Sequence, residues 1–396
     1  MNILIISHSF HPFKYVSAKR MSALAVFLKQ KGDDVTVICA DKKEYGNNVY
    51  DYELNDLNIY HVVQNYSNKI CQKIFRPSQY AETLKKVLSI KHIDLIIISA
   101  GPFNYLSIVK KIKEINLSIK IVVDFRDILD GSDSNNNHKG FLKRIGYRMD
   151  LLAEKNAVKF ADCIWVVSNS MKNYYSQRYK DFRYKFYNIQ NGYDDILTSK
   201  STLSVIEKFT DYKRNDRVKF YIGVFGKFGW YDESYNGMLR EVIEKLLEDN
   251  IFVIIRQYGF MEERLKQTLF VNNASHYEYV ESKGYEKDIL ELQKCDATIA
   301  TSYLSEALGT KIFDYILINR PIIVYVPKKN SEMNRLVVNF ENGYPCTNKR
   351  DVYNSIIELS RKDNLYLTSN HDLRSEYSRS NQFEKSYKLI NDIVRG

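Results

Sequence analysis

The sequence has few cysteines and no long apolar run. Its five cysteines are scattered over 396 residues, none lies in a Cys-x-x-Cys pair, and an odd number cannot all pair within one chain. This pattern fits a reducing cytoplasm better than a disulfide framework. No segment reaches the roughly 18 consecutive apolar residues that a membrane span needs. The chain opens on a strand-like run and not on a signal peptide. We therefore expect a cytoplasmic protein, either soluble or peripheral at the inner face of a membrane.

Several binding motifs are also missing. The first strand-like run is not followed by a Gly-x-Gly-x-x-Gly fingerprint, which argues against NAD or FAD. The net charge of +10 favours an anionic partner. Because zinc-finger spacing, RNP-like aromatic motifs and a recognition helix are absent, we predict no nucleic-acid partner. An anionic membrane surface and a phosphate-bearing substrate explain the charge equally well.

Strand-like apolar runs alternate with amphipathic helical patterns along almost the whole chain, which is typical of doubly wound parallel sheets. A polar stretch at 200–216 interrupts the alternation. We therefore predict two Rossmann-like α/β domains, residues 1–199 and 217–376, with 200–216 as linker and 377–396 as a final helix. Ligands should bind in a cleft at the carboxyl ends of the strands. The predicted strands are 3–7, 34–40, 58–63, 94–99, 120–124, 163–167, 185–190, 219–225, 251–257, 276–280, 297–301, 321–326 and one near Tyr344.

Two strand-end loops of the first domain carry polar side chains. The loop Ser7–Phe13 contains His8 and His11, which are either a metal-binding pair or ordinary loop histidines. Arg20 follows on the next helical pattern. The second loop is Asp124-Phe-Arg-Asp127. There a carboxylate can accept a hydrogen bond from an acceptor hydroxyl, or the Arg126–Asp127 pair can simply close the loop. We assign His11, Arg20 and Asp124 to the part of the site that would bind the substrate carrying this acceptor hydroxyl.

The segment 138–160 predicts a basic amphipathic helix. Such a helix either lies on an anionic membrane or presents a solvated face above a core stripe. Its basic residues are Lys139, Lys143, Arg144, Arg148, Lys155 and Lys159, and its interleaved apolar residues are Phe141, Ile145, Leu151 and Leu152.

Two loops of the second domain are suited to phosphate. Glycines in Gly223–Gly229 allow close backbone approach, and Lys227 adds positive charge. Arg256, at the end of the next strand-like run, is either a further cation of the site or a surface arginine. The second loop, residues 305–315, predicts a helix opening at Gly309, Thr310 and Lys311, whose amides can face a phosphate. Asp314 can then accept hydrogen bonds from ribose hydroxyls, and Glu306 can contact the sugar. A helix with a capped amino terminus and no ligand would give the same sequence pattern.

Several segments together resemble one family. Glu306 and Asp314, with seven residues between them, are similar to its Glu-x7-Glu motif. The family is that of the retaining glycosyltransferases of the GT-B fold, family 4 (glycosyl transferases group 1). The other similar segments are Asp124-Phe-Arg-Asp127, Ala161–Ser168, Asn191-Gly-Tyr-Asp194, Cys295-Asp-Ala297, Gly309–Tyr315, Asn319-Arg-Pro321 and Tyr377-Ser-Arg379.

The resemblance implies an acceptor-binding first domain, a nucleotide-sugar-binding second domain and a final helix that crosses back to the first. It implies transfer with retention of anomeric configuration. The family usually has an arginine and a lysine in its glycine-rich loop. This sequence departs from that pattern, because only Lys227 is present and Asn236 lies near the position expected for the lysine.

The chemistry of such a transfer needs charge stabilisation at the leaving diphosphate. We expect Lys227, Arg256, Lys311 and the helix start at Gly309–Lys311 to provide it. The sequence has no Asp-x-Asp motif, so we expect no metal and no other cofactor. The candidate catalytic residues are Asp127, Arg126 and Glu306.

The predicted function is that of a hexosyltransferase-type enzyme. It would move a sugar from a UDP- or GDP-sugar to a glycan or lipid-linked acceptor, in cell-surface polysaccharide synthesis. Two alternatives stay open. A GT-B nucleotide-sugar epimerase would release an altered sugar nucleotide without an acceptor. A non-catalytic GT-B partner subunit would bind no nucleotide diphosphate.

Overall fold

The structure is a computed structural model that divides into two compact units, Met1–Asn191 with Gln382–Gly396, and Gly192–Asn381. Each unit is described by itself below. The residues that the structure describes are 1–14, 16–46, 49, 54, 57–63, 69–129, 141–208, 219–302, 304–362 and 371–395.

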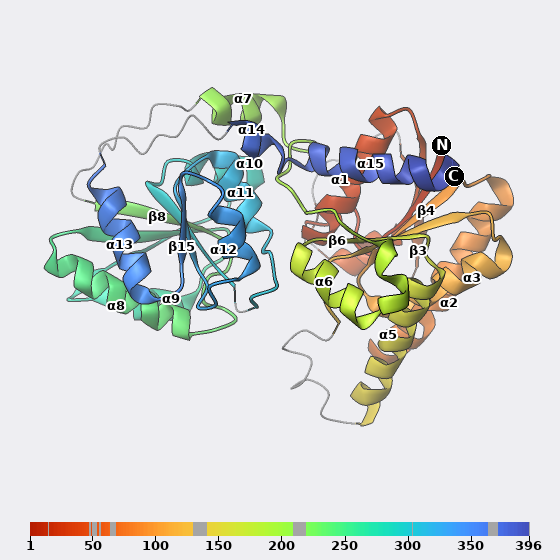
Figure 1. Cartoon of the computed structure of the whole chain (residues 1–396), viewed down its shortest axis with the longest axis horizontal. Helices are drawn as coiled ribbons and strands as arrows, with labels where there is room; N and C mark the ends of the chain where they lie inside the picture. Colours follow the sequence, from red (N-terminus) through yellow and green to blue (C-terminus); the bar gives the residue numbers. More distant parts are fainter. Residues whose placement is uncertain are drawn as a thin grey trace. The chain divides into compact units, whose positions relative to one another are not determined.

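The first unit is built on a seven-stranded sheet in the order β3-β2-β1-β4-β5-β6-β7, and every neighbouring pair is parallel (Figure 1). The five central strands β2, β1, β4, β5 and β6 are buried and mostly apolar, as parallel strands covered on both faces must be, whereas the edge strands β3 and β7 are more exposed. The bounds of the strands are β1 Asn2–Ile6, β2 Asp34–Ala40, β3 Asn58–Val62, β4 Leu95–Ala100, β5 Lys120–Phe125, β6 Cys163–Val166 and β7 Phe186–Asn188.

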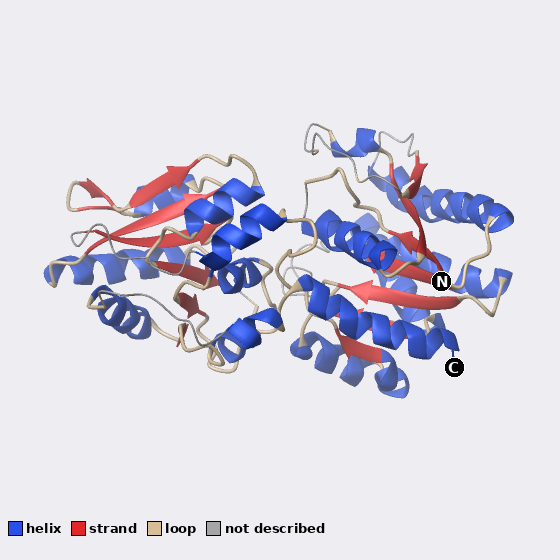
Figure 2. Cartoon of the chain, turned by 90° about the horizontal axis from the view of Figure 1, so that it is seen from above, coloured by secondary structure: helices blue, strands red, loops and turns tan. Residues whose placement is uncertain are grey.

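Helices cover both faces of this sheet (Figure 2). Alternate side chains of a strand point to opposite faces. Leu4 and Ile6 accordingly enter the core that contains Tyr80 and Ile112 on the covering helices. On α1, Phe27 packs against Phe383 of the last helix. The helices are α1 Val16–Gln30, α2 Lys69–Ile90, α3 Ile108–Ile115, α5 Phe141–Phe160, α6 Asn169–Arg178 and α15 Arg379–Arg395, with short 3-10 turns η1 Lys42–Tyr45, η2 Phe103–Ser107 and η3 Lys180–Lys185.

The second unit has a six-stranded parallel sheet in the order β12-β9-β8-β13-β14-β15. Phe220, Ile222 and Val224 of β8 belong to one core, while Tyr221 and Phe225 pack on the other. The strands are β8 Lys219–Phe225, β9 Phe252–Tyr258, β12 Tyr277–Val280, β13 Ala297–Thr301, β14 Ile322–Tyr325 and β15 Gly343–Cys346. The helices are α7 Lys200–Lys208, α8 Ser234–Glu248, α9 Glu263–Thr268, α10 Tyr285–Leu292, α11 Lys311–Ile318, α12 Glu332–Val337, α13 Lys349–Ser360 and α14 His371–Ser375.

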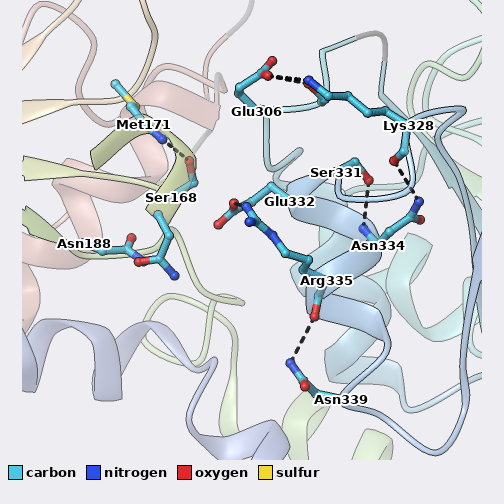
Figure 3. A network of polar contacts seen from close by, with 12 residues as sticks. Ser168, Met171, Asn188, Glu306, Lys328, Ser331, Glu332, Asn334, Arg335 and Asn339 are labelled. Atoms are coloured by element: carbon cyan, nitrogen blue, oxygen red, sulfur yellow. Dashed lines mark hydrogen bonds and ion pairs between the residues drawn. The ribbon is translucent and has the colours of Figure 1, made fainter. Parts of the chain in front are cut away.

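Local sequence signals explain where several helices begin and end. Ser168, Ser331 and Asn348 cap α6, α12 and α13 by accepting a backbone N–H in the first turn, and Figure 3 shows the first two caps. Asn319 ends α11 in the left-handed conformation that asparagine tolerates. None of the described helices combines the length and apolar character needed to cross a bilayer.

The predicted fold class of two Rossmann-like α/β domains, each with a parallel sheet, is confirmed. The hairpin of β10 Phe270–Val271 and β11 Ala274–Ser275 was not predicted, since a two-residue strand has no periodicity to detect. Residues 200–208 of the predicted linker form α7 in the second unit, and 209–216 lie outside the described residues. Residues 382–396 of the last helix belong to the first unit.

The Asn-Gly-x-Asp segment lies where the chain enters the second unit. The Tyr193 amide donates to the Tyr377 carbonyl at 3.0 Å, and the Arg379 amide donates to the Tyr193 carbonyl at 2.9 Å. Asp194 forms an ion pair with Arg379 at 2.8 Å. Gly192 has a φ of +65°, and a Cβ there would lie 2.8 Å from the Arg379 backbone nitrogen. The motif therefore joins the start of the second unit to the segment that precedes α15.

Candidate functional site

The glycine-rich loop after β8 is held by side chains from three other segments. The Gln257 amide donates to the Gly226 carbonyl at 2.6 Å, and the Thr301 hydroxyl donates to the Phe228 carbonyl at 2.9 Å. Glu262 is buried and accepts the backbone N–H groups of Phe228 and Gly229. Together these contacts hold the three consecutive peptides 226–227, 227–228 and 228–229, so the backbone of the loop is preorganised before any ligand arrives.

Lys311 joins this loop to the start of α11. It is the first residue of that helix, and its Nζ donates a hydrogen bond to the Lys227 carbonyl. Burial lowers the pKa of the Lys311 ammonium to about 8, against the opposing effect of the Glu262 carboxylate. Gly309 and Thr310 directly precede it, as predicted for a helix start. A half-buried cation, a helix amino terminus and a glycine loop therefore converge, which favours an anionic ligand.

The Lys227 side chain lies against an aromatic cluster. Its Nζ is 4.4 Å from the Trp230 ring centroid, 5.2 Å from that of Phe260 and 5.5 Å from that of Tyr231. These are cation–π distances, and Trp230 and Tyr231 are exposed. The ammonium of Lys227 is thus stabilised beside the loop by ring faces and can be drawn away by a stronger anionic partner.

Two predicted carboxylates have defined partners in the second unit. The Tyr285 hydroxyl donates to Asp314 Oδ1 at 2.6 Å, and burial with the Asp314 charge holds the pKa of Tyr285 well above its usual value. Glu306 accepts from the Ser305 hydroxyl, which together with Lys328 lowers the pKa of Glu306. Figure 3 shows Glu306 beside Lys328, whose Nζ is 3.2 Å from Glu306 Oε1. Both carboxylates therefore accept hydrogen bonds from neighbouring hydroxyl groups.

Arg256 lies within β9 and not in the loop that follows the strand. Its Nε and Nη2 donate to Glu278 at 3.0 and 2.9 Å, and its guanidinium covers the Tyr221 ring. Burial alone would lower the pKa of Arg256, but the hydrogen bonds with Glu278 hold it above its ordinary value. The Arg256 charge is therefore paired with the Glu278 carboxylate.

In the first unit, Arg20 and Asp124 form a buried ion pair. Arg20 Nε and Nη2 donate to the two Asp124 oxygens at 3.1 and 3.0 Å. The guanidinium also donates to the carbonyls of Ile189 and Gln190. Both side chains are almost fully buried. This geometry joins α1, β5 and the segment after β7, so the pair holds these three segments of the first unit together.

The remaining residues of the Asp-Phe-Arg-Asp loop are more accessible. Arg126 Nη1 donates to the Ser17 carbonyl at 2.9 Å, whereas its buried Nε has no hydrogen-bond partner. Asp127 is exposed, and its backbone carbonyl accepts from the Tyr175 hydroxyl at 3.3 Å. Among the described residues, none is found in a hydrogen bond or ion pair with the Asp127 carboxylate.

The two histidines of the first loop contact different parts of the first unit. His11 is buried and its backbone amide donates to the Ser22 hydroxyl, while His8 Nδ1 lies 3.1 Å from the Tyr80 hydroxyl. Burial, aided by Arg76, lowers the pKa of His8 to about 4. Across the part of the chain that the structure describes, no group of three or more His, Cys, Asp or Glu side chains is arranged to hold a metal ion.

Sequence reasoning missed Glu262 and Gln257, which fix the glycine loop. Glu262 lies four residues beyond the end of β9 and directly precedes α9. A carboxylate between a strand end and a helix start was a usable signal. Gln257 is inside β9, where nothing in the sequence distinguishes it from a core residue.

The comparisons with known proteins agree with this architecture. Residues 18–195 match the profile of Glycosyltransferase Family 4. The chain is similar to sucrose-phosphate synthase from Thermosynechococcus elongatus, with 14% identity, a TM-score of 0.67 and coverage of 98% of this chain and 99% of that one. No curated protein sequence matches.

Two further solved structures share the fold over the full length. One is the catalytic domain of Starch Synthase IV from Arabidopsis thaliana bound to ADP and acarbose, with 12% identity, a TM-score of 0.62 and coverage of 100% and 99%. The other is WaaG, a glycosyltransferase involved in lipopolysaccharide biosynthesis, with 12% identity, a TM-score of 0.60 and coverage of 100% of both chains.

Proposed function

We propose that this chain, a GT-B-type glycosyltransferase whose amino-terminal domain belongs to family 4, transfers a sugar from a UDP- or GDP-sugar to a glycan or lipid-linked acceptor. We further propose retention of configuration and a place in cell-surface polysaccharide synthesis. The observation that carries the donor assignment is the hydrogen bond from Lys311, at the start of α11, to the carbonyl of Lys227 in the glycine loop. The ADP bound to the similar starch synthase domain supports a nucleotide donor.

The leaving diphosphate would be stabilised by groups that are already in position. The Lys311 ammonium, the amino-terminal amides of α11 and the backbone of the loop Gly226–Gly229 would all contact the diphosphate, since Lys311 joins the start of α11 to this loop. Lys227 would leave its aromatic cluster for the diphosphate. Asp314, oriented by Tyr285, would accept the ribose hydroxyls, and Glu306 would hold the donor sugar. Under this proposal no metal ion is required.

Donor binding tests this assignment directly. We expect UDP or GDP to raise the melting temperature in the presence of EDTA, because lysines and helix amides supply the positive charge. Binding should also change Trp230 fluorescence, since Lys227 would leave the ring face 4.4 Å away. The chain's other tryptophan, Trp165, is fully buried in the first unit, so acrylamide quenching separates the two signals.

A Trp230→Phe variant is the optical control, which should keep the thermal shift and lose the fluorescence change. A shift that needs added Mg²⁺ or Mn²⁺ would contradict the metal-free site. If no nucleotide diphosphate binds, the chain is a non-catalytic partner subunit. Conversion of the sugar nucleotide without an acceptor would identify an epimerase.

On the acceptor side we propose that Asp127 accepts a hydrogen bond from the attacking hydroxyl, with Arg126 beside it. We expect Asp127→Asn to lower kcat/KM for the acceptor by about 10²-fold, because a positioned proton acceptor contributes on that order. Donor affinity should not change, because Asp127 belongs to the first unit and the donor groups to the second. Steady-state kinetics with varied acceptor measure the loss. Asp181→Asn, also exposed in the first unit, is the matched control. Equal kinetics in both variants would remove Asp127 from the mechanism.

A further inference from the structure

Helix α5 carries a stripe of large apolar side chains that face solvent. Phe141 is 79% exposed, Leu152 60%, Ile145 40% and Met149 38%. At 100° per residue these four positions lie within about 80° of the helix circumference. The spacing therefore makes one continuous apolar ridge along three turns.

The ridge lies opposite the face by which α5 packs on its own unit. Ala153, Ala157 and Val158 are buried in the first core, and the helix packs against η2 and α3. Figure 1 shows the amino-terminal half of α5 extending beyond the other helices of its unit. The apolar ridge is thus not a core stripe, which was one of the two interpretations that the sequence allowed. Scattered single apolar residues need no explanation, but a continuous ridge does.

The charge on the same side of α5 is of one sign. Arg144, Arg148 and Lys155 are exposed and follow the edge of the ridge. The two acidic residues of the helix do not offset them there. Glu154 is buried and accepts hydrogen bonds from the hydroxyls of Tyr175 and Tyr179, and Asp150 is half-buried. The accessible surface of α5 therefore combines apolar side chains with cations.

We propose that α5 docks the chain on an anionic lipid bilayer. Phe141, Ile145, Met149 and Leu152 would enter the boundary between headgroups and acyl chains, while Arg144, Arg148 and Lys155 would contact lipid phosphates. A bilayer matches both properties of the ridge at once, because an anionic protein partner would satisfy the cations but has no general need of four exposed apolar side chains. The docking is independent of the transfer reaction proposed above and would persist without donor or acceptor.

Vesicle flotation of the full chain tests the proposal. We expect binding to phosphatidylcholine vesicles that contain phosphatidylglycerol, and weak binding to phosphatidylcholine alone. The double variant Phe141→Ser/Leu152→Ser should bind the anionic vesicles at least about tenfold more weakly, because apolar insertion is lost. Arg144→Gln/Arg148→Gln should bind more weakly at low salt and lose most of the salt dependence.

The double variant Ile115→Ser/Leu117→Ser is the matched control, since both side chains are exposed elsewhere on the first unit, and it should float like the wild type. Donor-induced thermal shifts should be unchanged in all variants, which separates a failure here from a failure of the proposed function. Wild-type chain that does not float, or ridge variants that float equally well, would overturn the proposal. So would a dimer in solution that the ridge variant abolishes, because the occupant would then be a second copy of the chain.

Discussion

Replacing Lys311 with methionine is expected to lower turnover of the donor by about 10²- to 10³-fold, the usual loss when one preorganised group at a developing charge is removed. Methionine keeps most of the aliphatic length of lysine but carries no charge, so the substitution removes the charge without leaving a cavity. The loss should appear in kcat as well as in donor affinity, since the charge on the diphosphate grows as the sugar–phosphate bond breaks. Lys266→Met, at an exposed position of α9, is the matched control.

The same lysine predicts a pH dependence. Its pKa is lowered by burial to about 8, so the free chain loses this positive charge as pH rises through about 8. Donor affinity should therefore weaken on the alkaline side, although a bound diphosphate will itself favour the ammonium and move the midpoint upward. Isothermal titration calorimetry from neutral to alkaline pH measures the donor affinity. The affinity of the Lys311→Met variant should not change with pH over that range. A wild-type profile that stays flat would show that the charge of Lys311 does not contribute to binding.

The second large effect is on stability, at Gly192. We expect Gly192→Ala to lower the free energy of unfolding by about 2 to 4 kcal/mol, because strain at positive φ adds to a backbone clash. The added Cβ would lie 2.8 to 2.9 Å from backbone atoms of Arg379 and Ser378, which cannot rotate away as a side chain can. The change would weaken the segment where Asp194 pairs with Arg379, the first residue of α15. Urea denaturation followed by circular dichroism measures the loss.

Gly237→Ala is the matched control and should act in the opposite direction. Gly237 lies inside α8, and an added Cβ would meet no atom within 4 Å. Alanine there should stabilise the chain by about 0.5 to 1 kcal/mol through helix propensity. If both variants are equally stable, the close approach at Gly192 does not restrain the chain.

Partners far apart along the chain had no signal in the sequence. Arg20 was assigned to the acceptor side from its position alone, yet its partner Asp124 is 104 residues away and the pair is buried. Arg256 appeared at a strand end, but β9 runs to Tyr258 and places Arg256 opposite Glu278 of β12. Both outcomes depend on strand order and register, which bring together residues that no local pattern connects.

The sequence by itself determined the two α/β domains, the strands of both sheets and the helix start at Lys311, because apolar periodicity, caps and glycines act within a few residues. It also identified α5 as basic and amphipathic. Only the tertiary structure decided that the apolar ridge of α5 faces solvent, that Glu262 and Gln257 hold the glycine loop, and that Lys311 reaches Lys227. These features need the packing of segments distant in sequence, and the pairing of such segments is fixed by burial of the whole core.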